Sequence, residues 1–145
     1  MRRVRNEKGG IAAALSEAQK IVFGPFIFQA VVAARRLGIL KAFSESTDPL
    51  TFKAVAQKCG LSEYAVEVTG DVLTAVGVLT PKAEGYVITK TGDCLLYDPM
   101  TVANLDFTAD VCYKGLAHLG ESLKSGHPEG LKELGNWPTI YPALS

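Results

Sequence analysis

The chain has 145 residues, of which 48% are hydrophobic and 21% are charged. These values fit one folded globular domain and exclude a disordered or collagen-like chain. Basic and acidic residues balance at 15 each, so no net charge attracts the chain to nucleic acid or to an anionic membrane surface.

Two helices are expected at the start of the chain, over residues 11–23 and about 25–37. Gly24 and Pro25 separate them, because proline cannot continue a helix but fits the first turn of the next one. Between Phe26 and Ala34, apolar side chains cover almost the whole circumference of the second helix, and Gln29 is the only polar interruption of this stretch. Such a helix is buried on all sides.

A small domain can hardly cover every face of a helix near its own terminus, so this pattern favours a second subunit and a homodimer. A central core helix is the plainer interpretation. The same stretch, residues 21–40, is the longest apolar run, but a Gly-Pro pair, a glutamine and two arginines interrupt it. We therefore expect no insertion into a membrane.

The middle of the chain has the pattern of a helix, a tight turn and a second helix. Thr51 is the expected N-cap of a helix over residues 52–58, and Gly60 ends that helix in the left-handed conformation. Ser62 is the expected N-cap of the next helix, which runs to about Val76 with apolar residues at three-and-four spacing.

A β-hairpin is expected directly after these two helices, with short strands over residues 78–80 and 86–89. Together, residues 51–90 have the element order of a winged helix, a helix-turn-helix followed by a hairpin wing. The predicted fold class is therefore mainly α, a winged-helix-like domain with additional N- and C-terminal helices.

The last part of the chain is expected to be helical again. A brief helix covers residues 91–97, Asp98-Pro99 marks a turn, and helical periodicity continues to Gly126. The candidate inward positions are Val102, Leu105, Phe107, Val111, Cys112, Leu116, Leu119 and Leu123. Apolar periodicity then continues to Leu144, and we expect the chain to be the front part of something longer.

The charge pattern of the second helix argues against DNA binding. Residues 61–81 contain no lysine or arginine, while Glu63, Glu67 and Asp71 lie four residues apart along one face. Carboxylates placed against a phosphate backbone are repelled, and none is a usual partner of guanine. We expect no nucleic-acid partner, although a winged-helix transcriptional regulator stays open as an alternative function.

The sequence contains no motif that carries chemistry. Its glycines form no G-x-G, and neither a G-x-S-x-G elbow nor an H-E-x-x-H helix occurs. Cys112, His118 and His127 lack the spacing of metal ligands. The prediction is therefore that no residue of this chain is catalytic, binds a cofactor or holds a metal.

Three cysteines, Cys59, Cys94 and Cys112, are widely spaced and form no disulfide framework, which indicates reduced thiols and a cytoplasmic protein. The residues before the first helix do not have the pattern of a signal peptide, so none is expected. His118 lies on a mostly apolar helix, where a hydrogen-bonded core or pocket-rim histidine is favoured over a ligand or a general base. Phe107, Tyr113 and Trp137 fit a ligand cavity, with core packing as the plainer alternative.

Several short motifs follow one another in a fixed order between about residues 20 and 142. They are Phe28-Gln29-Ala30, Arg36-Leu37-Gly38-Ile39-Leu40, Leu50-Thr51, Val55-Ala56, Cys59-Gly60-Leu61, Val72-Leu73, Val76-Gly77-Val78-Leu79, Gly85-Tyr86-Val87-Ile88-Thr89, Gly92-Asp93-Cys94-Leu95-Leu96, His118-Leu119 and Leu123-Lys124-Ser125-Gly126-His127-Pro128. In this order they resemble the N-terminal dimerisation domain of S-adenosylmethionine-dependent O-methyltransferases.

The resemblance implies a winged-helix-like dimerisation domain that precedes a Rossmann-like catalytic domain. It divides the chain into a flexible N-terminus with the start of the first helix (1–19), the dimerisation domain (20–98) and a helical connector and acceptor lid (99–145). It also implies a homodimer whose N-terminal helices interlock. The candidate interface residues are Phe23, Phe26, Ile27, Phe28 and Val31.

Four residues, Phe107, Tyr113, Leu116 and His118, would line the pocket of a small-molecule methyl acceptor and contribute shape rather than proton transfer. Relatives often carry a tryptophan where Leu116 stands. The implied function is the dimerisation and substrate-pocket portion of a methyltransferase acting on a small-molecule hydroxyl. S-adenosylmethionine would bind the full-length enzyme and not this chain, which alone is predicted inactive. A stand-alone dimerisation module is the other alternative.

Overall fold

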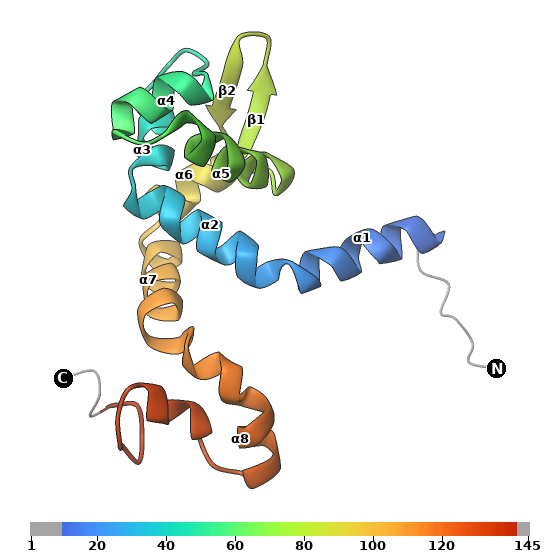
Figure 1. The fold of residues 1–145 in the computed structure, drawn as a ribbon, viewed down its shortest axis with the longest axis vertical. Coiled ribbons are helices and arrows are strands. Elements are labelled where there is room, and N and C mark those ends of the chain that lie inside the picture. Colours follow the sequence, from blue (N-terminus) through green and yellow to red (C-terminus); the bar gives the residue numbers. More distant parts are fainter. Residues whose placement is uncertain (1–9, 142–145) are drawn as a thin grey trace. The chain divides into compact units, whose positions relative to one another are not determined.

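The computed structural model describes residues 10–141. The chain divides into two compact units, unit 1 ending at Val87 and unit 2 beginning at Ile88 (Figure 1). The described part is mainly helical with one two-stranded sheet, which confirms the predicted mainly α fold with a hairpin. Two predictions, the flexible start of the 1–19 segment and the apolar position Leu144, lie outside the described residues.

The part of unit 1 that the structure describes contains five helices and the hairpin, whose last residue, Ile88, is the first of unit 2. In chain order they are α1 (Gly10–Val22), α2 (Gly24–Arg36), α3 (Ile39–Ser44), α4 (Phe52–Cys59), α5 (Glu63–Ala75), β1 (Leu79–Lys82) and β2 (Gly85–Ile88). The predicted order of helix, tight turn, helix and hairpin is therefore present.

The ends of α4 and α5 are set by the expected residues. The hydroxyl of Thr51 accepts a hydrogen bond from the amide of Ala54, and that of Ser62 accepts one from Ala65, both at 3.2 Å. Gly60 ends α4 with φ +67°. The two hydroxyls accept hydrogen bonds from amides that have no acceptor within their own helix. Gly60 adopts the left-handed conformation that ends α4.

The core of unit 1 lies among the second half of α2, α3, α4, α5 and β1. Ile39, Leu40, Val55, Val66 and Leu73 are completely or almost completely buried there. Full burial of such a side chain contributes about 1.5–3 kcal/mol, so this cluster is the main source of stability of the unit.

A long-range contact fixes the hairpin to the start of α4. The amide of Leu50 donates to the carbonyl of Tyr86 at 3.0 Å, and the amide of Tyr86 donates back at 2.9 Å. Gly85 precedes this bridge with φ +144°, and a Cβ there would lie 2.6 Å from the carbonyl of Leu50. Only glycine permits this approach, so Gly85 determines how closely the hairpin lies against residue 50.

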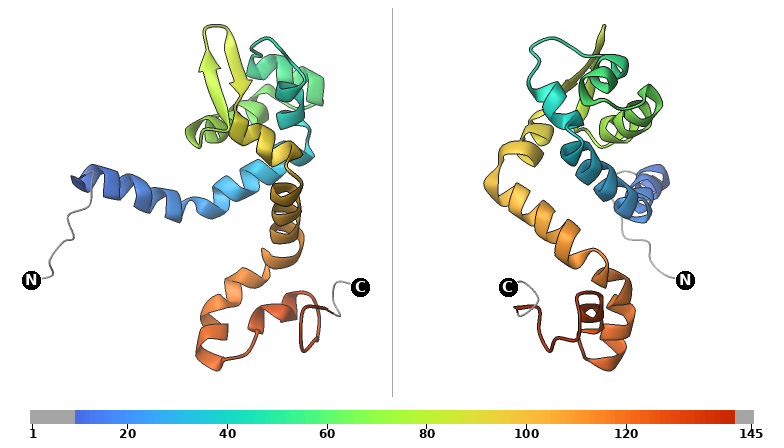
Figure 2. Two further views of the ribbon diagram at one scale, coloured as in Figure 1. Left: turned by 180° about the vertical axis from the view of Figure 1, so that it is seen from behind. Right: turned by 60° about the vertical axis from the view of Figure 1, so that its left-hand side comes forward.

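The first helix, α1, has no buried residue. It leads into α2 through a bend of 57° and extends away from the other helices of unit 1, as the left view of Figure 2 shows. No single helix among residues 10–141 is long and apolar enough to cross a membrane, although α1 and α2 would reach that length and composition if taken as one bent pair.

Unit 2 is a succession of short helical segments. They are α6 (Lys90–Tyr97), α7 (Pro99–Phe107), the π-helical turn η1 (Thr108–Cys112), the 3-10 turn η2 (Gly115–His118), α8 (Leu119–Ser125) and the 3-10 turn η3 (Glu129–Glu133). The predicted turn at Asp98-Pro99 is the start of α7, with Asp98 as its N-cap. The domain boundary expected after residue 98 falls between α6 and α7, which pack on each other.

Half of the positions expected to face inward in this part of the chain do not. Leu105 is buried, and Val102, Val111 and Cys112 are half-buried. The other four side chains are exposed in unit 2: Phe107, Leu116, Leu119 and Leu123. The expectation fails because helical spacing defines an apolar stripe but not the element that covers it.

Two glycines bring η2 and η3 together. A Cβ on Gly130 would lie 2.6 Å from the carbonyl oxygen of Gly115, and a Cβ on Gly115 would lie 3.0 Å from that of Gly130. The two backbones therefore touch where neither residue has a side chain. This contact turns the end of the described chain back onto η2.

Candidate functional site

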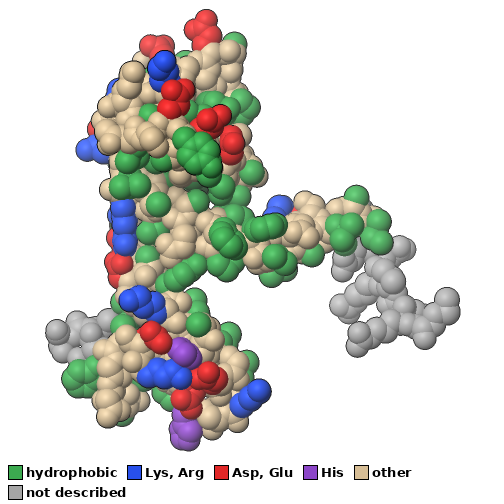
Figure 3. All heavy atoms as spheres, viewed as in Figure 1, with side chains coloured by type: hydrophobic (Ala, Val, Ile, Leu, Met, Phe, Trp, Pro, Cys, Tyr) green, Lys and Arg blue, Asp and Glu red, His purple; other side chains and the backbone are tan. Residues whose placement is uncertain are grey.

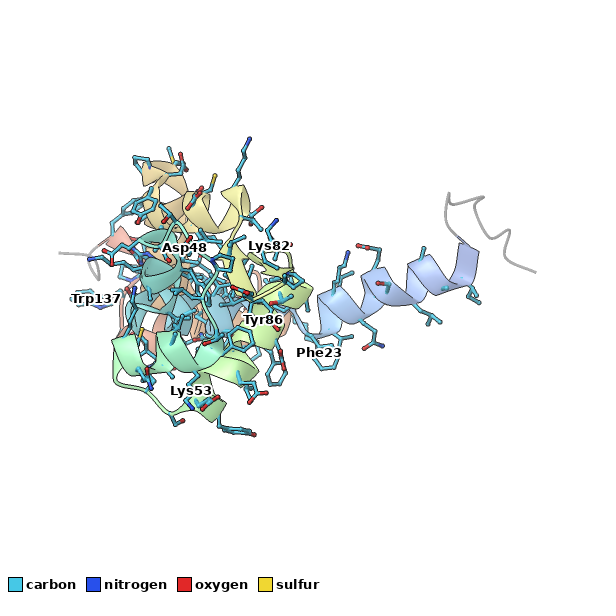
Figure 4. All side chains as sticks on the ribbon, turned by 90° about the horizontal axis from the view of Figure 1, so that it is seen from above. Phe23, Asp48, Lys53, Lys82, Tyr86 and Trp137 are labelled. Carbon is cyan, nitrogen blue, oxygen red and sulfur yellow. The ribbon has the colours of Figure 1, made fainter. Side chains whose placement is uncertain are left out.

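An apolar groove lies in unit 1 where α1, α2 and α5 meet. It has a volume of about 370 Å³ and is lined by Ser16, Gln19, Lys20, Phe23, Phe26, Ile27, Val72, Ala75 and Val76. Hydrophobic side chains gather along α1 and at its junction with the rest of unit 1 (Figure 3). Figure 4 places Phe23 at this junction.

The groove exists because the chain bends between α1 and α2. Gly24 and Pro25 start α2 with proline in its first turn, and Phe23 is left outside both helices. The rings of Phe23 and Phe26 then lie 6.1 Å apart between centroids, tilted by 60°. Both remain largely accessible, with 51% and 72% of their surface exposed.

The five predicted interface residues are divided between this groove and the core. Phe23, Phe26 and Ile27 line the groove. Phe28, the next residue along α2, is half-buried. Val31 is only 6% exposed and belongs to the core of unit 1. The expectation that α2 is buried on all sides is wrong within one chain, because its first half packs only partly against α5.

The rim of the groove carries one ion pair. Lys20 Nζ lies 2.6 Å from Glu17 Oε1 on the same helix, and both side chains are well exposed. Exposed pairs of this kind contribute little stability. The groove is thus defined by apolar surface rather than by charge.

The four predicted pocket residues lie on consecutive segments of unit 2. Leu116 and His118 share the η2 turn, whereas Phe107 and Tyr113 lie on the two sides of η1. Phe107 and Leu116 are 45% and 54% exposed, and Tyr113 and His118 are half-buried. Leu116 and His118 therefore lie two residues apart on one turn, and the two aromatic residues lie at the two ends of η1.

The turn between Phe107 and Tyr113 was not expected from the sequence. The amide of Tyr113 donates to the carbonyl of Thr108 at 2.8 Å, an i to i+5 hydrogen bond that widens the helix into a π-turn. Such turns are rare and frequently occur at functional sites. The residues of η1 carry no sequence signal for it, since π-turns depend on packing rather than on residue type.

His118 is held by two carboxylates. Its Nδ1 lies 3.2 Å from Glu121 Oε2, and its Nε2 lies 2.8 Å from Glu133 Oε1. Lys132 Nζ also contacts Glu121 at 2.8 Å. The hydrogen bond and charge of Lys132 lower the pKa of Glu121, with a smaller contribution from His118, and the same contact raises the pKa of Lys132.

Other groups with chemical potential are scattered. In the described part of the chain, no three His, Cys, Asp or Glu side chains converge as metal ligands. The three cysteines are free thiols, and burial raises the pKa of Cys59. On α5, Glu63, Glu67 and Asp71 are all exposed, so its accessible face is acidic.

The chain is similar to known proteins in family and in fold. A family model, the Dimerisation2-like domain, matches residues 16–86. No curated protein sequence matches the chain significantly.

Three solved structures illustrate the similarity of fold. Human N-acetylserotonin methyltransferase in complex with SAM superposes with a TM-score of 0.75 and 21% identity, over 97% of this chain and 42% of its own. The S-adenosylmethionine-dependent methyltransferase SibL gives 0.73 and 24%, over 83% and 36%. The mitomycin 7-O-methyltransferase MmcR gives 0.70 and 22%, over 90% and 39%. The chain spans about two fifths of the length of these proteins.

Proposed function

Residues 16–86 belong to the Dimerisation2-like domain family, and from this premise we propose that the chain is the dimerisation and substrate-pocket portion of a methyltransferase. The full enzyme would use S-adenosylmethionine and transfer its methyl group to the hydroxyl of a small molecule. The single observation that carries the proposal is the exposed apolar groove of unit 1.

The dimer interface would consist of this groove and of α1. In a two-fold dimer the same surface of each copy meets its counterpart. The exposed apolar residues Ile11, Leu15 and Val22 are spaced by four and seven along α1, which places them on one stripe. We propose that this stripe of one copy lies over the groove of the other.

The magnitude of the apolar effect supports this arrangement. Association of two proteins costs about 4–15 kcal/mol in lost freedom, whereas full burial of one large apolar side chain contributes about 1.5–3 kcal/mol. One residue cannot offset the cost. Each copy offers six such side chains on α1 and at its junction with α2: Ile11, Leu15, Ile21, Val22, Phe23 and Phe26.

The substrate-pocket part of the proposal rests on unit 2. Small-molecule sites are lined mostly by apolar and aromatic side chains with a few polar groups. In unit 2, Phe107 and Tyr113 flank the π-turn η1, and Leu116 lies on the next turn, η2. These residues would bind and orient the methyl acceptor. His118 would contribute to the shape of the rim, because both of its ring nitrogens already have carboxylate partners.

The alternative of a DNA-binding regulator is less well supported, since the exposed face of α5 carries Glu63, Glu67 and Asp71. A stand-alone dimerisation module would share the interface but not the pocket. The resemblance of fold to the three methyltransferases continues into unit 2, because the superpositions cover 83–97% of the chain. This coverage favours the enzyme over a module that ends with the hairpin.

A cross-linking experiment tests the proposed interface. The native cysteines are replaced by serine, and one sample carrying Leu15→Cys is mixed with another carrying Ala75→Cys, a groove residue of α5. If α1 of one copy lies over the groove of its partner, mild oxidation gives a disulfide-linked dimer of the two. Gln57→Cys, on the exposed surface of α4, is the control for Ala75→Cys. Equal cross-linking to both positions would contradict the proposed arrangement.

A further inference from the structure

The accessible face of α5 carries an acidic row, made of Glu63, Glu67 and Asp71. All three are exposed and follow one another every four residues, so they lie along one side of the helix over about 12 Å. Acidic side chains gather over this helix in Figure 3. Residues 61–81 contain no lysine or arginine. Within the described part of the chain, none of the three carboxylates forms a salt bridge, so their negative charge is unmatched there.

The acidic row continues into the apolar groove of unit 1. Asp71 is followed directly by Val72, and Ala75 lies one turn further along α5; both of these apolar residues line the groove. Val68, one turn before Val72, is 47% exposed. The face of α5 is therefore an unpartnered surface that is apolar at the groove and acidic beyond it.

The residues that precede α1 carry the opposite charge. They lie outside the described part of the chain, but their sequence contains Arg2, Arg3, Arg5 and Lys8 against a single acid, Glu7. Basic and acidic side chains are equally numerous in the whole chain, so this excess of positive charge is local. This basic segment, residues 2–8, leads into α1, the helix that we place over the groove of a second copy.

The lengths of the basic segment and of the acidic row are compatible. In the proposed interface, Leu15 of one copy lies near Ala75 of the other. A helix rises about 1.5 Å per residue, so Ile11 and Asp71 each lie about 6 Å further along their own helices. Seven extended residues span up to about 23–25 Å, which exceeds the length of the acidic row. The segment can therefore reach all three carboxylates.

Charge selects one of the two directions in which the second copy's α1 can lie. If its start points toward the start of α5, the basic segment continues past Asp71 to Glu67 and Glu63. If it points the other way, the segment meets residues 72–83, which contain one lysine, Lys82, and no carboxylate. The first direction is favoured because opposite charges attract and like charges repel.

We infer that the basic segment of one copy docks on the acidic row of a second copy. The inference rests on the proposed dimer, whose interface it extends beyond the groove. It adds the direction of α1 and a set of charged contacts to that proposal. By two-fold symmetry each copy provides one basic segment and one acidic row, so the contact is made twice in each dimer.

Charge reversal in two different copies tests the inference. The segment-reversed copy carries Arg2→Glu, Arg3→Glu and Arg5→Glu. The row-reversed copy carries Glu63→Lys, Glu67→Lys and Asp71→Lys. The dissociation constant of the dimer is measured by sedimentation equilibrium for each copy alone and for their mixture. The salt concentration is about 0.1 M, at which charges interact over about 10 Å.

Each reversed copy alone is expected to dimerise about tenfold more weakly than the unaltered chain, because like charges then face each other at both contacts. In the mixture, opposite charges face each other again at both contacts. A heterodimer of the two copies should therefore form, with a dissociation constant close to that of the unaltered dimer.

A third copy controls for net charge. It reverses three carboxylates of unit 1 that are exposed and line no part of the groove: Glu45→Lys, Asp48→Lys and Glu84→Lys. Its net charge equals that of the row-reversed copy. The segment-reversed copy should bind the row-reversed copy about tenfold more tightly than it binds this control. Equal binding to both would show that net charge alone acts, and would overturn the inference.

A neutral variant keeps the test decisive if the lysines unfold α5, since Glu63 in the first turn favours the helix. Glu63→Gln, Glu67→Gln and Asp71→Asn remove the charge and keep the size of each side chain. The unaltered dimer should weaken as the salt concentration rises from about 0.05 to 0.5 M, because salt screens the contacts. The neutral variant should be weaker at low salt and nearly independent of salt. The same salt dependence in both proteins would contradict the docking.

The remaining outcomes separate this inference from the proposed dimer. A dimer that neither reversal weakens would overturn the inference and leave the dimer intact. Two reversed copies that are each weakened but do not prefer each other would also overturn it, because the segment would then bind α5 of its own chain. An unaltered chain that is monomeric at micromolar concentration would overturn the proposed dimer, and the inference with it.

Discussion

The ring of Phe52 on α4 is stacked on the ring of Tyr86 on β2, with centroids 4.1 Å apart and 15° between the planes. Gly70 of α5 lies against the same phenylalanine, and a Cβ at this glycine would overlap the ring. One aromatic side chain thus joins α4, α5 and the hairpin. The absence of a side chain at residue 70 is what makes room for it.

Gly70→Ala should therefore destabilise unit 1, although alanine favours a helix over glycine by about 1 kcal/mol. Overpacking in a core typically costs about 1–3 kcal/mol, and the ring of Phe52 must move away from Tyr86. Gly120→Ala is the matched control, since a Cβ there meets open space on α8. Chemical denaturation should show a lower midpoint for Gly70→Ala and an unchanged or higher one for Gly120→Ala.

Ser62→Ala should destabilise α5 by about 1 kcal/mol, because the amide of Ala65 loses its capping partner. Ser62→Asp should retain most of the stability, since aspartate is an equally good N-cap. The measurement is the thermal unfolding midpoint of the three proteins. Equal midpoints for the alanine and aspartate variants would show that the cap does not contribute.

Asp98 gives the start of α7 a dependence on pH. Hydrogen bonds from the hydroxyl and amide of Thr101 lower its pKa. The carboxylate therefore favours the folded state above the ordinary aspartate range, about 3.9, and this contribution is lost as the pH falls through the lowered folded value. Asp98→Asn, which still caps the helix, should remove the dependence. The measurement is hydrogen exchange of the Thr101 amide, corrected for its intrinsic rate. Its protection should decline in acid in the unaltered chain and should not decline in Asp98→Asn.

The contact of Gly115 with Gly130 makes a prediction for unit 2. Gly130→Ala places a Cβ against the carbonyl of Gly115 and should separate η3 from η2. Trp137 emission should then differ from that of the unaltered chain, because the segment that carries the tryptophan follows η3. Emission identical to that of the unaltered chain would contradict the close contact of the two backbones.

Local signals in the sequence predicted the helix ends well and the tertiary contacts poorly. Thr51, Ser62 and Gly60 act through hydrogen bonds or dihedral angles within a few residues, so their roles follow from residue type. The bridge between Leu50 and Tyr86 joins residues far apart in the sequence, and no short motif marks it.

The candidate site shows the same division. The bend at Gly24 and Pro25 and the apolar character of α2 were predictable. It was not predictable that Val31 would be buried in the core while Phe26 is exposed in the groove. Which turn of an apolar helix is covered by its own chain depends on where α5 lies. In unit 2, likewise, nothing near His118 in the sequence indicates Glu133 as its partner.

The most direct test of the account is the mass of the protein in solution. Sedimentation equilibrium at micromolar concentration should give a dimer, two copies of 15.5 kDa. Phe26→Asp, in the groove, should give a monomer. Tyr64→Asp should remain a dimer, because Tyr64 is an equally exposed aromatic residue of unit 1, at 75% against 72% for Phe26, and does not line the groove. A monomeric unaltered chain, or a Phe26→Asp variant that stays dimeric, would contradict the proposed interface.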